Sequence, residues 1–269
     1  MTDNLSNSVW DQVEIKTARP HRWSLGEVSV WAKIKDDTLC LANSYPSGKD
    51  ESSLESPPDN ITWTTWPISS KTASIKMKPV FPDRPVVVKP ETSFRLPSNS
   101  KAKIFIRVPV WLKIILIGKK ELNLSMIPSV NLSGTWFGGF TSGELCYWIS
   151  SGMRQQTEPD VSRNHSTICP LTVVNDSCEE LIIEKICLHT DGFSLFFDGV
   201  QLWSDDITVS YKGSQDTTQI ISTGNPPQIS SNAKRITSAK TTLKKGFAAR
   251  TFASILELPG IGISSITGQ

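Results

Sequence analysis

A period-two alternation of apolar and polar residues, which returns several times, constrains the fold of this chain more than any other feature. Alternate side chains of an extended chain point to opposite faces, so the pattern predicts strands with one buried and one hydrated face. The clearest stretches are 28–35, 73–78, 101–108 and 207–212. Strands of this kind are typical of antiparallel sheets, and seventeen prolines leave little room for long helices.

We therefore predict an all-β protein made of two β-sandwich-like antiparallel domains, with at most short helices. Asp-Gly pairs at 191–192 and 198–199 indicate hairpin turns. Residues 241–258 are compatible with a short helix or, in their second half, with a last strand. Both alternatives stay open.

A change in composition near 128–134 predicts the boundary between the domains. Residues 1–127 would form a basic N-terminal β domain. Residues 128–269 would form an acidic C-terminal β domain that carries a basic tail segment, 217–269.

The distribution of charge supports this division. Residues 71–120 carry a net charge of +10 and residues 121–216 a net charge of −9, although the whole chain carries only +2. Such asymmetry favours binding of a protein partner or an anionic surface. Alternatively, the basic and acidic blocks complement each other, within one chain or between the chains of a homo-oligomer. A nucleic-acid partner is not expected, because few aromatics that could stack on bases, such as Phe105 and Trp111, accompany the basic block, and no nucleic-acid-binding motif does.

The ends and apolar runs of the chain predict a cytoplasmic protein. The first residues lack the basic and apolar regions of a secretory signal. The longest apolar run, around Ile114–Ile117, is interrupted by Lys113 and Lys119 and is too short to cross a bilayer. We interpret the five cysteines as buried thiols of a reducing compartment.

The best candidate for a metal site is the set Cys169, Cys178, Cys187 and His189. Cys187 and His189 are two residues apart, so on a strand they share a face and could reach one ion. The set lacks the tight cysteine pairs of structural zinc sites. We therefore predict no metal and no cofactor, and interpret the set as buried thiols and a hydrogen-bonded histidine.

For catalysis the weak candidates are His189 and Asp191, with the adjacent carboxylates Asp205 and Asp206 nearby in sequence. A hydrolase- or lyase-like enzyme that uses them is one alternative. Aspartates in turns are common for backbone reasons alone, and the chain has no nucleophile elbow, P-loop or dinucleotide fingerprint. We do not expect an enzyme.

Nine tryptophans suggest a second alternative, a carbohydrate-binding module with exposed indoles, although most tryptophans in β proteins fill cores. We expect any functional surface to be a groove where the Trp136–Gly139 turn meets the basic Arg84–Arg107 region. Its candidate binding residues are Arg84, Lys89, Arg107, Trp111, Trp136 and Phe137. A Trp136 buried in a closed core would contradict this hypothesis.

Four segments carry a resemblance to a known family: Phe81–Glu91, Arg107–Trp111, Thr135–Gly138 and Gly143–Tyr147. Together they resemble a prokaryotic, largely archaeal family of uncharacterised proteins known only as a domain of unknown function, over roughly residues 15–220. The resemblance brings no catalytic or ligand residues with it. Independently of it, the prolines around Val86–Val88 and Pro109 predict edge strands or bulges there.

These observations lead to one main functional hypothesis. We expect a non-enzymatic β-sandwich binding or assembly module that recognises a protein or an anionic surface. Charge segregation and the missing catalytic signatures motivate it.

Overall fold

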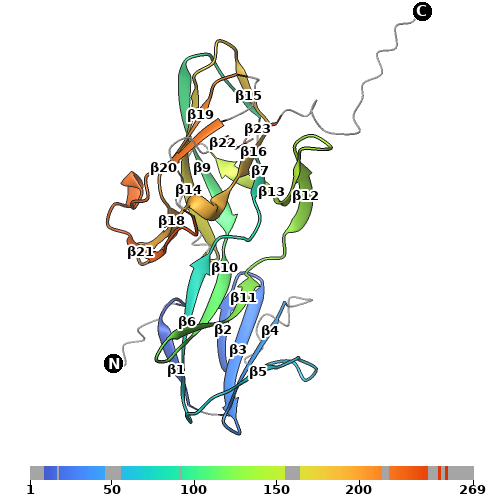
Figure 1. Cartoon of the computed structure of the whole chain (residues 1–269), viewed down its shortest axis with the longest axis vertical. Coiled ribbons are helices and arrows are strands. Elements are labelled where there is room, and N and C mark those ends of the chain that lie inside the picture. The colour runs from blue at the N-terminus through green and yellow to red at the C-terminus, as the bar shows by residue number, and fades with distance from the viewer. Residues whose placement is uncertain are drawn as a thin grey trace, which may run out of the picture. The chain divides into compact units, whose positions relative to one another are not determined.

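Strands form nearly all the regular structure of this protein (Figure 1). The computed structural model describes residues 9–16, 18–45, 56–90, 93–154, 164–213, 218–241, 248–249 and 252–253. Within these ranges the helical elements are two 3₁₀ turns, η2 (Thr190–Gly192) and η3 (Gln228–Ser230). The all-β prediction is confirmed.

The chain forms two compact units, and each is assembled from separate stretches of sequence. The first comprises the described residues within Met1–Val80, Pro109–Asn131 and Arg163–His165, and the second comprises the remainder. The predicted division after residue 127 lies near Asn131, where the chain leaves the first unit and continues in the second. The chain also passes between them near residues 80, 108 and 165.

The first unit contains two four-stranded antiparallel sheets. One has the order β1 (Gln12–Ile15), β6 (Ala73–Val80), β10 (Trp111–Ile117), β11 (Glu121–Pro128). The other has the order β2 (His21–Leu25), β3 (Val28–Lys35), β4 (Thr38–Ser44), β5 (Thr64–Pro67).

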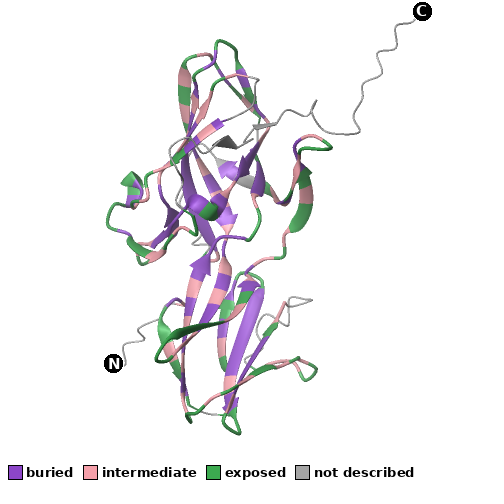
Figure 2. Cartoon of the chain, in the orientation of Figure 1, coloured by how far each residue is buried: buried purple, intermediate pink, exposed green. Residues whose placement is uncertain are grey.

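Alternation along the strands builds the core of the first unit (Figure 2). In β6 the buried residues include Ala73, Ile75 and Met77, while the lysines between them are more exposed, as the sequence predicts. Strand β3 departs from the pattern, because Ser29 and Trp31 are buried as well. The arginine of the neighbouring strand β2 lies over the Trp31 ring, so this face of β3 is covered too.

The second unit is built on a sheet of thirteen strands and a two-stranded ribbon. The main path runs β21 (Lys234–Thr237), β17 (Leu195–Phe197), β18 (Leu202–Ser204), β14 (Ser166–Asn175), β9 (Ser100–Pro109), β13 (Glu144–Arg154), β7 (Val86–Pro90), β16 (Lys185–Leu188), β23 (Phe252–Ala253). Off this path β12 (Ser133–Phe137) pairs with β13, β19 (Ile207–Tyr211) with β14, β20 (Thr218–Ser222) with β19, and β22 (Ala248–Ala249) with β20. The ribbon pairs β8 (Phe94–Leu96) with β15 (Leu181–Ile183).

The pairing in this unit is mixed and not purely antiparallel. Strand β13 runs parallel to β7, and β14 runs parallel to both β18 and β19. Alternation within a strand shows which face is buried but carries no information on the direction of its neighbour, so the sequence prediction missed these pairs.

The predicted turns had different outcomes. Asp198-Gly199 lies in the turn between the antiparallel strands β17 and β18, where Gly199 has a φ of +102°. Asp191-Gly192 is part of η2, which joins β16 to β17. These two strands pair with other partners, so the second hairpin prediction was wrong.

The prediction of edge strands or bulges near the prolines is correct only for the bulge: the register of β13 against β7 shifts between Ile149 and Met153, which pairs with Pro90. Strand β7 is an inner strand, with β13 on one side and β16 on the other. Pro85 precedes it, and Pro90 and Pro109 are the last residues of β7 and β9. The prolines therefore bound strands at their ends, where a missing backbone N–H is tolerated.

In the open stretch 241–258, the described pairs 248–249 and 252–253 are strands, and the remaining positions apart from residue 241 lie outside the described residues. No helix in the described ranges combines the length and the apolar character that crossing a bilayer requires.

Candidate metal centre

The site begins at the hairpin of β12 and β13 in the second unit. Gly138, just after β12, has a φ of +105°, a conformation that residues with a side chain rarely adopt. A Cβ on Gly143 would lie 2.3 Å from Nε1 of Trp136 and 2.7 Å from the carbonyl oxygen of Phe137. This close approach of backbone and indole fixes where β13 starts, at Glu144.

Two ligand-type side chains then follow on one face of β13. Glu144 and Cys146 are two residues apart, so their side chains point the same way. They pair in register with Phe137 and Thr135 of β12. Cys146 is fully buried, in a small apolar cluster with Val87, Phe137 and Cys187.

A second pair comes from β16. Cys187 lies on this strand and His189 follows it directly, in an extended conformation with φ −86° and ψ 97°. The two side chains therefore also share a face. Cys187 is opposite Val87 of β7, the strand that separates β13 from β16, so both pairs point over β7 toward each other.

Three of these side chains lie close together, and the fourth, Cys146, contacts one of them, Cys187. The Sγ atoms of Cys146 and Cys187 are 3.9 Å apart, and Nε2 of His189 is 2.7 Å from Oε1 of Glu144. Ligand atoms of Glu144, Cys187 and His189 all lie within 4.8 Å of one another. The thiols are buried, whereas the side chains of His189 and Glu144 are 20% and 41% exposed. The cluster is thus open to solvent on its carboxylate side.

The local electrostatics keep the Cys187 thiol protonated. Its hydrogen bond with Cys146, then burial, and then the charge of nearby Glu144 raise its pKa far above the ordinary value. A thiol in this state is a poor nucleophile, because the thiolate is the reactive form. The arrangement therefore does not favour a cysteine nucleophile with His189 as its base.

The structure separates the four residues that the sequence analysis considered as a metal set and interpreted as buried thiols with a hydrogen-bonded histidine. Cys187 and His189 lie together, as their spacing suggests. Cys169 is buried elsewhere, on β14, where burial raises its pKa to about 12, and Cys178 is exposed. Glu144 and Cys146 take their places. The sequence does contain a signal for them, because Glu144-x-Cys146 and Cys187-x-His189 both have the spacing of two that places side chains on one face of a strand. The sequence does not show, however, that the strands carrying these pairs lie on either side of β7.

The weak catalytic pair is not joined in the structure. His189 contacts Glu144, whereas Asp191 on η2 forms an ion pair with Lys240 at 2.9 Å. Asp205 is fully buried and accepts hydrogen bonds from the backbone of Ser194 and the hydroxyl of Ser222. Its contacts are those of a structural carboxylate.

The candidate binding residues are spread over the two units. Trp111 belongs to the first unit, and Arg84, Lys89, Arg107, Trp136 and Phe137 belong to the second. Trp136 is 45% exposed, with its Nε1 donating to the carbonyl oxygen of Gly139, whereas Phe137 is buried. An exposed Trp136 leaves the hypothesis of a surface near Arg84 standing as a prediction.

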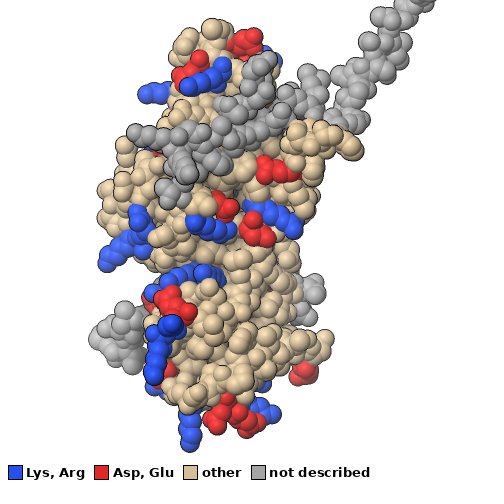
Figure 3. Space-filling model, in the orientation of Figure 1, with Lys and Arg blue, Asp and Glu red and all other residues tan. Residues whose placement is uncertain are grey.

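The charge blocks of the sequence do not correspond to the two units. Lysines 71–78 and 113–120 of the basic block belong to the first unit and Arg84–Arg107 to the second. Members of the block also form ion pairs with acidic residues from the other block, such as Lys78 with Glu121 and Lys103 with Asp206. Figure 3 accordingly shows basic and acidic groups interspersed on the face that it draws.

Comparison with known proteins adds a family assignment. No curated protein and no solved structure matches the chain. A family model with the description "Protein of unknown function (DUF432)" matches residues 9–257, which includes all four residues of the cluster and extends beyond the predicted 15–220. The chain therefore belongs to the family described as DUF432.

Proposed function

We propose that this protein binds one thiophilic divalent metal ion, with Zn²⁺ as the representative, through Cys146, Cys187, His189 and Glu144. The observation that carries the proposal is that ligand atoms of Glu144, Cys187 and His189 lie within 4.8 Å of one another, with the Sγ atom of Cys146 3.9 Å from that of Cys187. Two thiols, an imidazole and a carboxylate are the donor types found in protein zinc sites.

The distance between the two sulfur atoms supports a metal ion between them. Two thiolates bound to one zinc ion at about 2.3 Å in tetrahedral geometry are about 3.8 Å apart. The Sγ atoms of Cys146 and Cys187 are 3.9 Å apart before any ion is added. Metal binding would replace the hydrogen bond between His189 and Glu144 by two bonds to the ion, with a separation of those two atoms somewhat larger than 2.7 Å.

The alternative use of two neighbouring thiols is a disulfide. Cys146 and Cys187 lie on the two strands that flank β7, and both are free thiols with Sγ atoms 3.9 Å apart. A disulfide bond of about 2.05 Å requires the two sulfur atoms to approach each other, whereas a zinc ion bound to both fits the separation that is present.

The proposed role agrees with the expectation of a non-enzymatic binding protein and departs from it in one respect. From sequence we predicted no metal, because the two distant cysteines Cys169 and Cys178 were taken as the partners of Cys187. The buried thiols and the contact with Phe137 and Val87 suit an ion that holds β13 and β16 together.

The test is a zinc titration of the whole chain by calorimetry, with metal content measured by mass spectrometry. We expect one zinc per chain, and a loss of affinity of at least about tenfold in each of C146S, C187S and H189A. C169S is the matched control, because Cys169 is equally buried in the same unit but outside the cluster. Equal zinc binding by the C146S/C187S double variant and by the wild type would overturn the proposal.

A further inference from the structure

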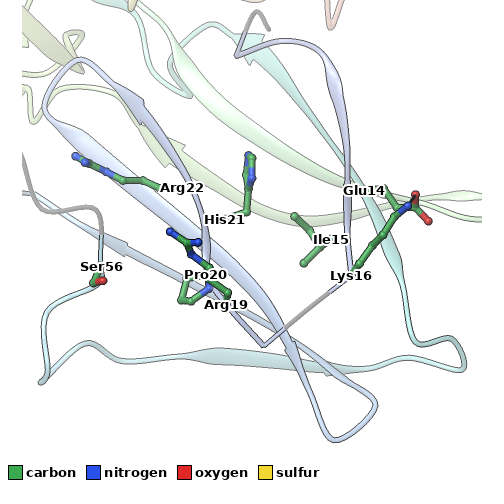
Figure 4. A pocket seen from close by; sticks show the side chains of 8 residues that line it. All are labelled: Glu14, Ile15, Lys16, Arg19, Pro20, His21, Arg22 and Ser56. Atoms are coloured by element: carbon green, nitrogen blue, oxygen red, sulfur yellow. Dashed lines mark ion pairs between the residues drawn. The ribbon is translucent and has the colours of Figure 1, made fainter. Parts of the chain in front are cut away.

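We propose that a pocket in the first unit, between the end of β1 and the start of β2, binds a small phosphorylated molecule. The pocket has a volume of about 550 Å³. Figure 4 shows that its walls come from three segments: the end of β1, the chain around Arg19–Arg22, and Ser56. The site is separate from the metal cluster, which lies in the second unit.

The charge of the pocket selects an anion. Its lining contains three cationic side chains, those of Lys16, Arg19 and Arg22, and one acidic side chain, that of Glu14. Glu14 forms an ion pair with Lys16 at 2.7 Å, and the Lys16 contact lowers the pKa of its carboxyl. The lining therefore keeps a net charge of +2 while its carboxylate is ionised. The planar forks of two arginines match the oxygen atoms of a phosphate.

Arg22 is already held in place. Its Nη2 atom donates a hydrogen bond of 2.9 Å to the hydroxyl of Ser29, and its guanidinium lies 5.9 Å from the centre of the Trp31 ring. A side chain that is fixed before the ligand arrives loses less conformational entropy on binding. This anchoring distinguishes Arg22 from an ordinary surface arginine.

The remaining walls suit the organic part of such a ligand. Ile15 is buried, and Pro20 adds a rigid apolar surface. The His21 ring packs edge-on against Trp23 with centroids 4.3 Å apart, and burial lowers the pKa of His21, which keeps the imidazole neutral at neutral pH. A pocket of this size falls within the range of small-molecule sites and exceeds the needs of an inorganic phosphate ion.

The test is a calorimetric or NMR titration of the whole chain with ribose 5-phosphate, inorganic phosphate and ribose. We expect saturable binding of ribose 5-phosphate, weaker binding of inorganic phosphate, and no binding of ribose. Affinity should fall as salt is added. Chelator treatment should leave the result unchanged, so a failure of the metal proposal does not affect this one.

The variants R19Q and R22Q locate the site. Each should weaken binding of ribose 5-phosphate by about tenfold, since each removes charge-assisted hydrogen bonds. R95Q is the control, because Arg95 is an exposed arginine paired with Glu180 in the other unit. Arg19 is exposed, so R19Q should keep the wild-type thermal unfolding curve even where R22Q does not.

Three results would overturn the inference. The first is the absence of saturable binding of ribose 5-phosphate and inorganic phosphate. The second is binding of ribose 5-phosphate that is as strong in R19Q, with an unchanged unfolding curve, as in R95Q. The third is binding of a single-stranded oligonucleotide without binding of ribose 5-phosphate.

Discussion

At the scale of single residues, Gly143 illustrates how the metal cluster depends on the turn beside it. An added Cβ would overlap the Trp136 indole and the Phe137 carbonyl, as the distances of 2.3 and 2.7 Å show. We expect G143A to lower the free energy of unfolding by about 1–3 kcal/mol through overpacking. Urea denaturation measures it. G118A is the control, because the nearest atom to its Cβ would be 3.8 Å away; an equal loss in both variants would contradict the account.

The carboxylate of Asp198 is held by several hydrogen bonds, so its titration should affect stability. Its carboxylate accepts hydrogen bonds from the backbone of Val200 and Gln201, from Nε1 of Trp203 and from the hydroxyl of Ser230. Burial alone would raise the pKa of Asp198, but these hydrogen bonds outweigh it and lower the pKa from its ordinary 3.8. The folded pKa is thus below the unfolded one, so the stabilisation is complete above the unfolded pKa.

Because the pKa of Asp198 is lowered in the folded protein, the ionised carboxylate stabilises the fold at pH 7. We therefore expect that D198N lowers the free energy of unfolding at pH 7 by about 1–3 kcal/mol, because an amide nitrogen cannot accept the donated hydrogen bonds. The difference from wild type should shrink as the pH falls from 3.8 through the lower folded pKa. Urea denaturation at several pH values measures both. A difference that stays constant down to pH 2 would show that the ionised carboxylate is not the cause.

Residue types and spacing predicted half of the cluster. The spacing of two between Cys187 and His189 predicted that they share a face, and the ligand atoms do lie together. Glu144 and Cys146 were missed, because their approach depends on both strands flanking β7. Such an arrangement results from pairings between distant parts of the chain, which no local pattern encodes.

At the scale of elements, the position of β7 between β13 and β16 has a chemical consequence. The thiols of Cys146 and Cys187 come from strands on either side of β7, and their Sγ atoms are 3.9 Å apart, against about 2.05 Å in a disulfide. We therefore expect that mild oxidation of the metal-free protein by hydrogen peroxide does not link them. Peptide mass spectrometry of the oxidised protein measures this. A disulfide in high yield between these two cysteines would mean that the strands are not held in this order.

The elements themselves were largely predictable. Alternation predicted β3, β6, β9 and β19 within about two residues of their ends. It could not predict parallel pairing, as in β7 with β13. It also could not predict that the side chain of Arg22 covers Trp31 of β3, so that Trp31 is buried. Prolines were interpreted as marks of edge strands or bulges; Pro90 ends an inner strand, at a shift of register in its pairing with β13. Residue types and their period-two alternation identify a strand, whereas the strands that pair with it depend on the rest of the chain.

At the scale of the whole molecule, the two units should respond differently to metal. The proposed ion connects β13 and β16, which both belong to the second unit. Zinc at about one hundred times its dissociation constant adds about 2.7 kcal/mol to the stability of the form that binds it. We expect slower hydrogen exchange in β13 and β16 and unchanged exchange in β3 of the first unit. Equal slowing in both units would contradict a local site.

The two units of the structure differ from the division that composition predicted. Charge blocks suggested a basic domain followed by an acidic one. Each unit instead takes stretches from both sides of residue 127, and oppositely charged blocks meet within a unit, as Lys103 does with Asp206. Net charge along a sequence reflects the fold only when each domain is one continuous stretch.

The most direct test of the metal centre is a cobalt(II) titration followed by absorption spectroscopy. Cobalt bound to cysteine thiolates in tetrahedral geometry gives a sulfur-to-metal charge-transfer band together with strong visible bands. We predict both at one equivalent of cobalt, with the charge-transfer band about halved in C187S and unchanged in C169S. A spectrum without the charge-transfer band, or one that C146S and C187S both leave intact, would contradict the account.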